Sequence, residues 1–293
     1  MNTVFHIGFQ RTASTWLKAN VFSKIPVFYG NDDEECSNLF YGYILSKNFL
    51  EYNKKHAITG FKKIIKNKKT FLFSEESMVG KLLEPDIVSA KEILQRLSDL
   101  GKVKIIIFVR NQITIIWSLY KQYLKLGGYC DIHDFLYKEK ASRYLDYLKY
   151  DLYLDYCHKL FGKKNVYVEC YENLITNPTL AIKNMVYFID KDIRGNIEID
   201  KRPINRGYSP KVFSSLRALN RKSETRKNPC GEKDFDIFNY ETCREMLNRY
   251  SLSLMENKPK KISSEVVAYC CRYKKFNNKL KNICDIERYR YPL

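Results

Sequence analysis

Polar side chains suited to binding an anion follow the first apolar stretch of the chain. Residues 4–7 are typical of a short buried strand, Gly8 ends it, and a polar turn then leads into an amphipathic helix. Free backbone N–H groups meet the positive end of the helix dipole at such a turn, so the turn attracts negative charge. Arg11 adds a guanidinium with several donors. The turn residues that could contact an anion are Gln10, Arg11, Thr12, Ala13, Ser14 and Thr15.

This turn does not have the sequence of a Walker A phosphate loop. That loop needs G-x-x-x-x-G-K-[ST], in which the lysine and the hydroxyl serve a magnesium nucleotide. No Gly-Lys pair follows Gly8, so the pattern indicates an anion site of another kind. The structural alternative is a simple capped helix, with Thr12 or Ser14 as its N-cap.

Two neighbouring carboxylates follow a second apolar stretch. Residues 70–73 are typical of a buried strand, and the sequence Ser-Glu-Glu-Ser comes directly after it. A carboxylate at a strand end can remove a proton from a hydroxyl within hydrogen-bond reach. We predict that Glu76 is this base, with Glu75 and His133 as the other possibilities. A solvated acid at the start of a helix is the alternative role for Glu76, and His6, inside the first strand, is expected to be a core histidine.

An arginine and a serine follow the strongest strand pattern in the chain. Residues 102–109 form a continuous Ile/Val/Phe run, which is typical of a strand buried on both faces of a parallel sheet. Arg110 ends the run, and Ser118 lies in the following helix. An unpaired guanidinium at the end of a buried strand is costly. Arg110 therefore requires an anionic partner, either a ligand phosphate or a core carboxylate.

The strands alternate with helices along the chain. This alternation predicts βαβ units and a parallel sheet, in which ligands bind beyond the carboxyl ends of the strands. A fourth polar cluster, with Tyr171 at its start, follows a strand over residues 165–170, and its ring could stack on a purine or pack in the core. The four clusters are therefore expected to share one site. An acidic loop is expected over Asp32–Glu35, and helices are expected over Asn38–Tyr52, Ile87–Leu100, Ile113–Leu126, Ser142–Phe161 and Pro178–Ile189.

The composition is that of a globular protein with an excess of positive charge. The 293 residues are 45% hydrophobic, and no run of eighteen apolar residues or signal-peptide pattern occurs. The nine cysteines form no C-x-x-C pair, which indicates reduced thiols in a cytoplasmic protein, and the histidines and cysteines lack zinc-ligand spacing. The net charge is +18, and residues 201–293 hold 22 Lys+Arg against 10 Asp+Glu. Either an anionic partner or simply solvated lysine-rich faces would explain this excess.

The motifs together resemble those of sulfotransferases that use 3′-phosphoadenosine 5′-phosphosulfate (PAPS), in particular bacterial and carbohydrate-type members. His-Ile-Gly and Arg-Thr-Ala-Ser-Thr-Trp-Leu are similar to the family's 5′-phosphosulfate loop, H-I-G-x-x-[KR]-[TS]-G-[TS]-[TS]-x-L, with Ala13 at the usual glycine. The segment from Arg110 to Tyr120 is similar to its 3′-phosphate motif, R-[ND]-P-x(5)-S-x-Y, with Gln112 at the usual proline. Ser-Glu-Glu-Ser and Tyr-Glu-Asn-Leu also have counterparts in the family.

The resemblance implies a role for each of these residues. Arg110 and Ser118 would bind the 3′-phosphate, and Tyr171 would lie against the adenine. Arg206 and Gly207 would belong to a loop that closes over the nucleotide.

The resemblance also implies a fold and a reaction. The fold would be α/β, with three layers and a central parallel sheet in one domain over 1–293 that becomes helical and basic from about residue 190. Glu76 would act as base, and Arg11 would stabilise charge on the leaving phosphate. A sulfuryl group would pass from PAPS to a hydroxyl, with a carbohydrate or glycolipid as the favoured acceptor. The reaction would leave adenosine 3′,5′-bisphosphate (PAP) and require no metal. A cytoplasmic location is expected, with contact to the anionic inner face of the membrane left open.

Two other classes of function remain as alternatives. A P-loop kinase or other nucleotide-dependent phosphotransferase should carry Gly-Lys-[Ser/Thr] and a strand-ending aspartate for magnesium. A non-enzymatic basic module would bind polyanions in a salt-sensitive way, although nucleic acid is not an expected partner of a sulfotransferase.

Overall fold

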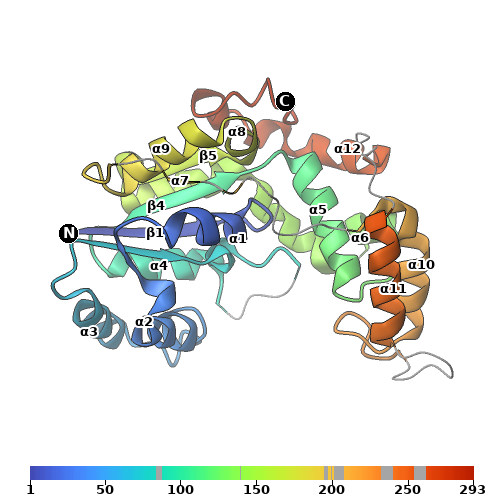
Figure 1. Ribbon diagram of the computed structural model, residues 1–293, viewed down its shortest axis with the longest axis horizontal. Helices are drawn as coiled ribbons and strands as arrows, with labels where there is room; N and C mark the ends of the chain where they lie inside the picture. The colour runs from blue at the N-terminus through green and yellow to red at the C-terminus, as the bar shows by residue number, and fades with distance from the viewer. Residues whose placement is uncertain are drawn as a thin grey trace.

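A five-stranded sheet forms the centre of the computed structural model (Figure 1). All strand pairs are parallel, and the strand order is β2-β3-β1-β4-β5, which confirms the predicted parallel sheet. The strands are β1 (Asn2–Gly8), β2 (Phe28–Tyr29), β3 (Thr70–Ser74), β4 (Lys104–Val109) and β5 (Val166–Cys170). The structure describes residues 1–83, 88–138, 140–194, 197–198, 200, 208–231, 240–253 and 262–293.

Helices connect the strands and continue beyond the last one. The α-helices are α1 (Ser14–Leu17), α2 (Glu34–Leu39), α3 (Lys54–Ile65), α4 (Ala90–Asp99), α5 (Gln112–Lys125), α6 (Ile132–Tyr137), α7 (Tyr150–Phe161), α8 (Tyr171–Thr176), α9 (Pro178–Ile189), α10 (Phe213–Lys222), α11 (Tyr240–Ser253) and α12 (Ser264–Cys270). Short 3₁₀ or π segments that matter below are η1 (Lys18–Phe22), η3 (Phe40–Ile44), η4 (Glu76–Val79) and η5 (Lys140–Leu148).

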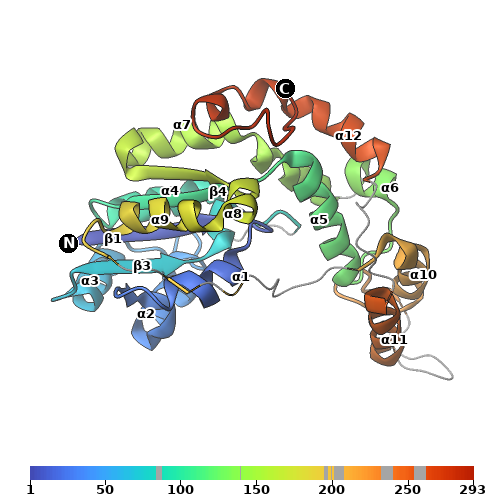
Figure 2. The same cartoon turned by 45° about the horizontal axis from the view of Figure 1, so that its top comes forward.

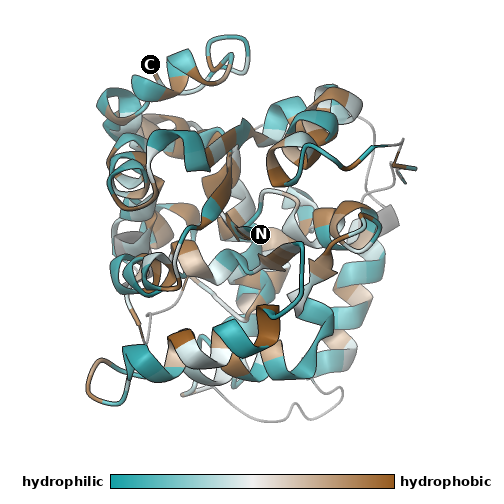
Figure 3. Cartoon of the chain, turned by 90° about the vertical axis from the view of Figure 1, so that its left-hand side faces the viewer, coloured by the Kyte–Doolittle hydropathy of each residue, from teal (hydrophilic) through white to brown (hydrophobic). Residues whose placement is uncertain are grey.

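Helices cover both faces of the sheet, which gives three layers (Figure 2). On one face, Val4 and the even-numbered side chains of β4 pack against α1, η1, α8 and α9. On the other face, Phe5 and the odd-numbered side chains of β4 pack against η3, α3, α4 and α7. Because successive strand residues point to opposite faces, a strand covered on both sides needs apolar residues throughout. Figure 3 shows the corresponding pattern, with hydrophilic residues on the outward faces of the surrounding helices.

The predicted long helix over Ser142–Phe161 is wrong. The chain instead forms η5, breaks at Lys149, and begins α7 at Tyr150. One reason is that the Leu148 carbonyl accepts a hydrogen bond from the Gln112 side chain (3.2 Å). A side-chain partner for this carbonyl removes it from the helical ladder, and the break turns Tyr150 towards the end of β4.

The boundaries of two other predicted helices also shift. The helix expected over Asn38–Tyr52 begins earlier, at Glu34, because the Asp33 side chain accepts from the Cys36 N–H (2.8 Å) and caps α2. The expected acidic loop is therefore partly a helix start. This helix also ends earlier than predicted, because η3 finishes at Ile44 and the Asn48 side chain accepts from the N–H groups of Leu50 and Glu51 in a turn. The helix expected from Ile87 begins at Ala90 with Ser89 as its cap, and residues 84–87 lie outside the described part of the chain.

The helices after residue 208 extend the fold beyond the sheet and then return to it. α10 packs on α5, where the buried Asn220 side chain donates to the carbonyls of Leu124 and Gly128 (2.8 and 2.7 Å). The C-terminal segment runs back to β4, and the Asn111 side chain donates to the carbonyls of Tyr289 and Arg290 (2.9 and 2.7 Å).

All nine cysteines are free thiols. Within the described ranges, no helix has the length and apolar character needed to cross a membrane.

Candidate active site

The polar clusters predicted at the strand ends meet at one edge of the sheet. β1 lies between β3 and β4, and β5 lies beside β4. Because all strands are parallel, the residues that follow Gly8, Ser74, Val109 and Cys170 all emerge at the same edge.

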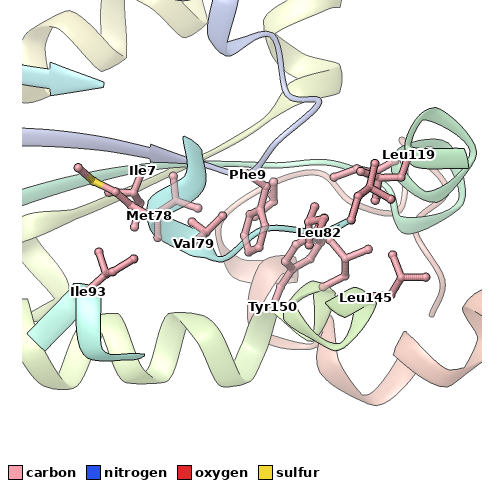
Figure 4. Packing of buried hydrophobic residues seen from close by; sticks show 14 of the residues in the cluster. Ile7, Phe9, Met78, Val79, Leu82, Ile93, Leu119, Leu145 and Tyr150 are labelled. Carbon is pink, nitrogen blue, oxygen red and sulfur yellow. The ribbon is translucent and has the colours of Figure 1, made fainter. Parts of the chain in front are cut away.

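The loop after β1 is a tight turn with two non-glycine residues in the left-handed region. Arg11 has φ of 67° and Ala13 has φ of 69°. The Thr12 hydroxyl donates to the Phe9 carbonyl. The Phe9 ring packs edge-on against Tyr150 (centroids 5.1 Å apart) in the apolar layer below the loop (Figure 4). A left-handed conformation at Ala13 costs about 1–2 kcal/mol that a glycine would avoid, which explains why glycine is common at this position of the motif.

The first residue of α1 presents a buried hydroxyl to this turn. Ser14 is 5% exposed, and its Oγ has no hydrogen-bond partner among the described residues. A buried hydroxyl without a partner is costly. An anion held by the turn would remove this cost, so the residues fit a phosphate or sulfate group. Thr15 is exposed, and Gln10 accepts from the Leu82 N–H (3.2 Å).

Arg11 and Arg110 are joined to each other and to Ser118. The Arg11 Nε donates to Ser118 Oγ (2.9 Å), and the Arg110 Nη1 donates to the Arg11 carbonyl (2.7 Å). Burial and the neighbouring Arg110 guanidinium lower the pKa of Arg11. Part of this lowering of the pKa reflects repulsion between the two positive charges, and an anion bound near both would offset the repulsion.

The backbone of Arg110 is held by a buried tyrosine. The Tyr150 hydroxyl donates to the Arg110 carbonyl (2.6 Å) and accepts from the Arg110 N–H (3.3 Å). The Arg110 side chain also donates to Thr114 Oγ1 (2.9 Å) and lies over the Tyr171 ring, 4.3 Å from its centroid. In the described ranges, no carboxylate lies within ion-pair distance of Arg110. The described residues therefore do not include the core carboxylate that was the alternative partner of Arg110.

The two carboxylates after β3 have different environments. Glu75 accepts from the Ser77 N–H and from the Tyr41 hydroxyl (both 2.9 Å), so it caps η4 and is tied to η3. The Lys18 ammonium group lies 3.2 Å from the Glu76 carboxylate and 4.0 Å from that of Glu75. Of the two, Glu75 is the more fully engaged in holding local structure, and Glu76 is the better placed to take a proton.

Gly8 brings Glu76 against the phosphate-type loop. Gly8 has φ of 103°, and a Cβ atom placed on it would lie 3.0 Å from the Cα and Cβ of Glu76. Only glycine allows this backbone conformation together with so close an approach. The strand end that leads into the loop therefore also fixes the position of the candidate base.

The histidines play no direct part in this cluster. His6 is fully buried, shares a hydrogen bond with Ser74 (2.7 Å), and lies against Phe22 and Phe108. Burial lowers the pKa of His6 to about 3, with Lys18 as a smaller cause. His133 is exposed on α6, which packs against α12 and η5.

Several residues that support the site carry little signal in the sequence. Glu172 accepts from the Asn111 N–H (3.0 Å) and from the Tyr291 hydroxyl (2.9 Å), and burial raises its pKa. No motif in the sequence distinguishes Lys18 from other helix lysines, or Tyr150 from the many other tyrosines. Of these residues, only Glu172 has a sequence signal, because it is the carboxylate of Tyr-Glu-Asn-Leu at the end of a predicted strand.

Arg206 and Gly207, predicted for the closing loop, lie outside the described residues. The described residue nearest before them is Asp200, whose carbonyl accepts from the Trp16 indole (2.8 Å) and whose N–H donates to the Asn20 side chain (3.3 Å). In the described part of the chain, no group of three or more His, Cys, Asp or Glu side chains is arranged to hold a metal ion.

A comparison with known protein families assigns the chain to one of them. The sequence model of the sulfotransferase domain matches residues 2–245, so the chain belongs to the sulfotransferase family. That match spans both arginines and Glu76. It makes the protein an enzyme of the sulfotransferase type, which transfers sulfuryl groups.

Solved structures with low identity are also similar. The sulfotransferase from Alicyclobacillus acidocaldarius shares 14% identity at a TM-score of 0.49, over 75% of this chain and 94% of its own. The sulfotransferase domain of the Synechococcus PCC 7002 olefin synthase shares 14% identity at a TM-score of 0.42, over 92% and 93%. Mouse sulfotransferase SULT7A1, solved with PAP, shares 15% identity at a TM-score of 0.35, over 92% and 88%. No curated protein matches the chain.

Proposed function

We propose that the protein transfers the sulfuryl group of PAPS to the hydroxyl of a carbohydrate or glycolipid. The observation that carries this proposal is the connected pair of guanidiniums at neighbouring strand ends, Arg11 with Ser118 and Arg110 with the Arg11 carbonyl. PAPS is an adenylate with anionic groups at two ends, and it supplies the sulfuryl group. The buried, unpartnered Ser14 hydroxyl marks where one of those anionic ends would bind.

The residues of the loop would hold the phosphosulfate end. Backbone N–H groups at the start of α1, the Ser14 hydroxyl and the Arg11 guanidinium are donors that need no reorganisation when charge develops on the leaving oxygen. Gln10, Thr12 and Thr15 complete the turn, although the Thr12 hydroxyl already serves the Phe9 carbonyl.

Arg110 would hold the 3′-phosphate, with Ser118 beside it. Tyr171 lies under the Arg110 guanidinium, so one face of its ring is covered and the adenine would meet its other face or edge. We also propose that Arg206 and Gly207 close over the nucleotide, that residues 1–293 form one domain, and that the protein acts in the cytoplasm without a metal.

Glu76 would take the proton of the acceptor hydroxyl. Its carboxylate is paired with Lys18 at 3.2 Å, and its backbone is fixed against Gly8. Glu75 would position Tyr41 at the edge of the acceptor side. Asn31 joins this rim, since its amide donates to the Tyr41 hydroxyl (3.3 Å) and its Oδ1 accepts from the Ser74 N–H (2.8 Å). A polar acceptor suits a rim of Tyr41, Asn31 and Lys18 better than a flat apolar one, which favours a sugar.

A thermal-shift comparison tests the nucleotide part of the proposal. PAP should raise the melting temperature more than equal concentrations of ATP with Mg²⁺ or of an oligonucleotide, because a ligand stabilises the state that binds it. Arg110→Ala should abolish most of the PAP shift, and Lys91→Ala on the distant α4 should retain it. Stabilisation by magnesium ATP alone would favour a nucleotide phosphotransferase, and stabilisation by the oligonucleotide alone would favour a polyanion-binding module.

A second experiment tests the base. Glu76→Gln should keep the PAP shift and reduce sulfuryl transfer from labelled PAPS by about 100-fold, within the range attributed to general bases. Glu75→Gln is the matched control in the same segment and should retain more activity. Full activity of Glu76→Gln would move the base elsewhere. A panel of glycan and glycolipid acceptors in the same assay would identify the acceptor.

A further inference from the structure

The turn between η3 and α3 exposes two large apolar side chains. Phe49 is 74% exposed and Leu50 is 82% exposed, more than any other large hydrophobic side chain among the described residues. Single exposed apolar residues are common on protein surfaces, but two adjacent ones on a loop tip are a feature of interaction sites.

The turn is ordered by its own hydrogen bonds. The Asn48 Oδ1 accepts from the N–H groups of Leu50 and Glu51 (2.9 and 3.2 Å), and its amide donates to the Glu51 carboxylate (2.8 Å). The Tyr52 N–H donates to the Asn48 carbonyl (3.0 Å). Asn48 therefore fixes the turn that carries the two apolar side chains, so their exposure is a property of a defined conformation.

A strongly basic segment adjoins this turn. Residues 45–69 contain eight lysines and a single acid, Glu51. Lys54 pairs with Asp99 and Lys63 with Glu35. Lys47 pairs with Glu51 and Lys69 with Asp192. Four further lysines of this segment are exposed and form no ion pair within the described ranges. Lys68 lies over the Phe28 ring, and the other three are Lys55, Lys62 and Lys66.

Lys55 and Lys62 lie in α3, and Lys66 directly follows its last residue. Spacings of seven and eleven residues return to nearly the same angle on a helix with 3.6 residues per turn. The opposite side of α3 carries Ala57 and Phe61, which are buried in the core. The positive stripe therefore faces away from the sheet, on the same segment as the apolar turn. We call Phe49, Leu50, Lys55, Lys62 and Lys66 the basic–apolar patch.

We infer that the basic–apolar patch docks the protein onto an anionic lipid bilayer. Apolar side chains insert into the headgroup boundary, and lysines nearby are attracted to the negative surface potential. A soluble polyanion would engage the lysines but would give no reason for Phe49 and Leu50 to remain exposed. The combination therefore favours lipid over glycan or nucleic acid.

The turn that carries Phe49 and Leu50 follows, in sequence, a segment in contact with the candidate active site. η3 leads into the turn, and its Tyr41 hydroxyl donates to Glu75 next to the candidate base. The inference concerns lipid binding and stands apart from the proposed sulfuryl transfer.

Vesicle sedimentation with the full chain tests the inference. The wild type should bind vesicles of phosphatidylcholine with about 30% phosphatidylglycerol at least 10-fold more strongly than pure phosphatidylcholine vesicles, as expected for several lysines acting at an anionic surface. Phe49→Ser with Leu50→Ser should weaken that binding about 10-fold or more, since the insertion of two apolar side chains is lost. Replacing the three patch lysines with glutamate should weaken it about 100-fold or more and remove its salt dependence.

A matched control is available on the opposite face of the sheet. Ile175 on α8 and Tyr187 on α9 are 59% and 67% exposed, and their replacement by serine should leave vesicle binding unchanged. Every variant should keep the PAP thermal shift, which separates a failed docking surface from a failed fold or nucleotide site. The inference is overturned if the wild type does not bind anionic vesicles. It is equally overturned if the Phe49/Leu50 variant binds as well as the wild type, or if the control loses as much affinity as the patch variants.

Discussion

Replacing Gly8 with alanine tests whether the phosphate-type loop and the candidate base form one rigid unit. The new Cβ would lie 3.0 Å from the Cα and Cβ of Glu76 and 3.1 Å from its carbonyl oxygen, and the backbone there has φ of 103°. The backbone strain costs about 1–3 kcal/mol. The contact with main-chain atoms adds about 1–3 kcal/mol, as in other overpacked sites.

The contact should also move Glu76 away from the loop. The new Cβ would lie 3.0 Å from Glu76, whereas ordinary contacts between carbon atoms begin about 0.4 Å further apart, near the optimum of about 3.5 Å. A displacement of that size should lower turnover about 10-fold or more, since a misplacement of about 1 Å can cost 100-fold. PAP binding should fall less than turnover, because Arg110 is held by Tyr150 and not by Gly8.

Gly101→Ala is the matched control for backbone strain. Gly101 also has a positive φ, 119°, but a Cβ placed there has no atom within 4 Å. Urea unfolding should show a larger loss of stability in Gly8→Ala than in Gly101→Ala, and only Gly8→Ala should lose turnover with labelled PAPS. Equal stabilities together with wild-type turnover of Gly8→Ala would refute the idea that this close approach positions the base.

Three other perturbations test separate parts of the site. Tyr150→Phe leaves both backbone groups of Arg110 without their buried partner, so we expect a loss of about 1–3 kcal/mol in urea unfolding and a smaller PAP thermal shift; an unchanged shift would mean that this anchor does not matter for binding. Lys18→Met removes the 3.2 Å partner of Glu76 and should lower kcat about 10-fold, as expected for a charge-assisted contact of about 1.5 kcal/mol, with little change in PAP affinity; an unaltered kcat would contradict a positioning role. Because the pKa of His6 is lowered to about 3 in the folded state, only the unfolded state gains its proton as pH falls below about 6.5, so stability should decline by up to about 1.4 kcal/mol per pH unit between those values. His6→Gln should show a shallower decline when unfolding is measured from pH 7 to pH 4, and identical slopes would refute the assignment.

The sheet and its ligand edge could be predicted from the sequence because the strands are buried on both faces. A continuous run such as Lys104–Val109 has few alternative structures, and Gly8 and Arg110 mark the ends of their strands within a residue. The parallel arrangement then brings the loop after β1 and the residues after β3 and β4 together. β2, with only Phe28 and Tyr29, is too short to produce a pattern.

The supporting contacts could not be predicted, because they join residues far apart in the chain. Lys18 meets Glu76 only after β1 and β3 pair, and Tyr150 reaches Arg110 only because the helix breaks at Lys149. That break depends on a side chain of α5, Gln112, which no local pattern between residues 142 and 161 reveals. The strands could be predicted because they follow from the local sequence. The residues that support the site, such as Lys18 and Tyr150, could not, because their contacts form only in the folded protein.

The hydrogen bonds from Asn111 to residues 289 and 290, and from Tyr291 to Glu172, affect the order in which the protein can mature on the ribosome. The candidate anion-binding turn and Arg110 are translated well before residues 289–291, which supply the partners of Asn111 and Glu172. Until then the Glu172 carboxylate lacks the hydrogen bond from the Tyr291 hydroxyl, and Asn111 lacks the carbonyls of residues 289 and 290. Competence to bind nucleotide should therefore arise late in translation, and polypeptides that stop before residue 289 should depend on chaperones instead of on ligand for protection.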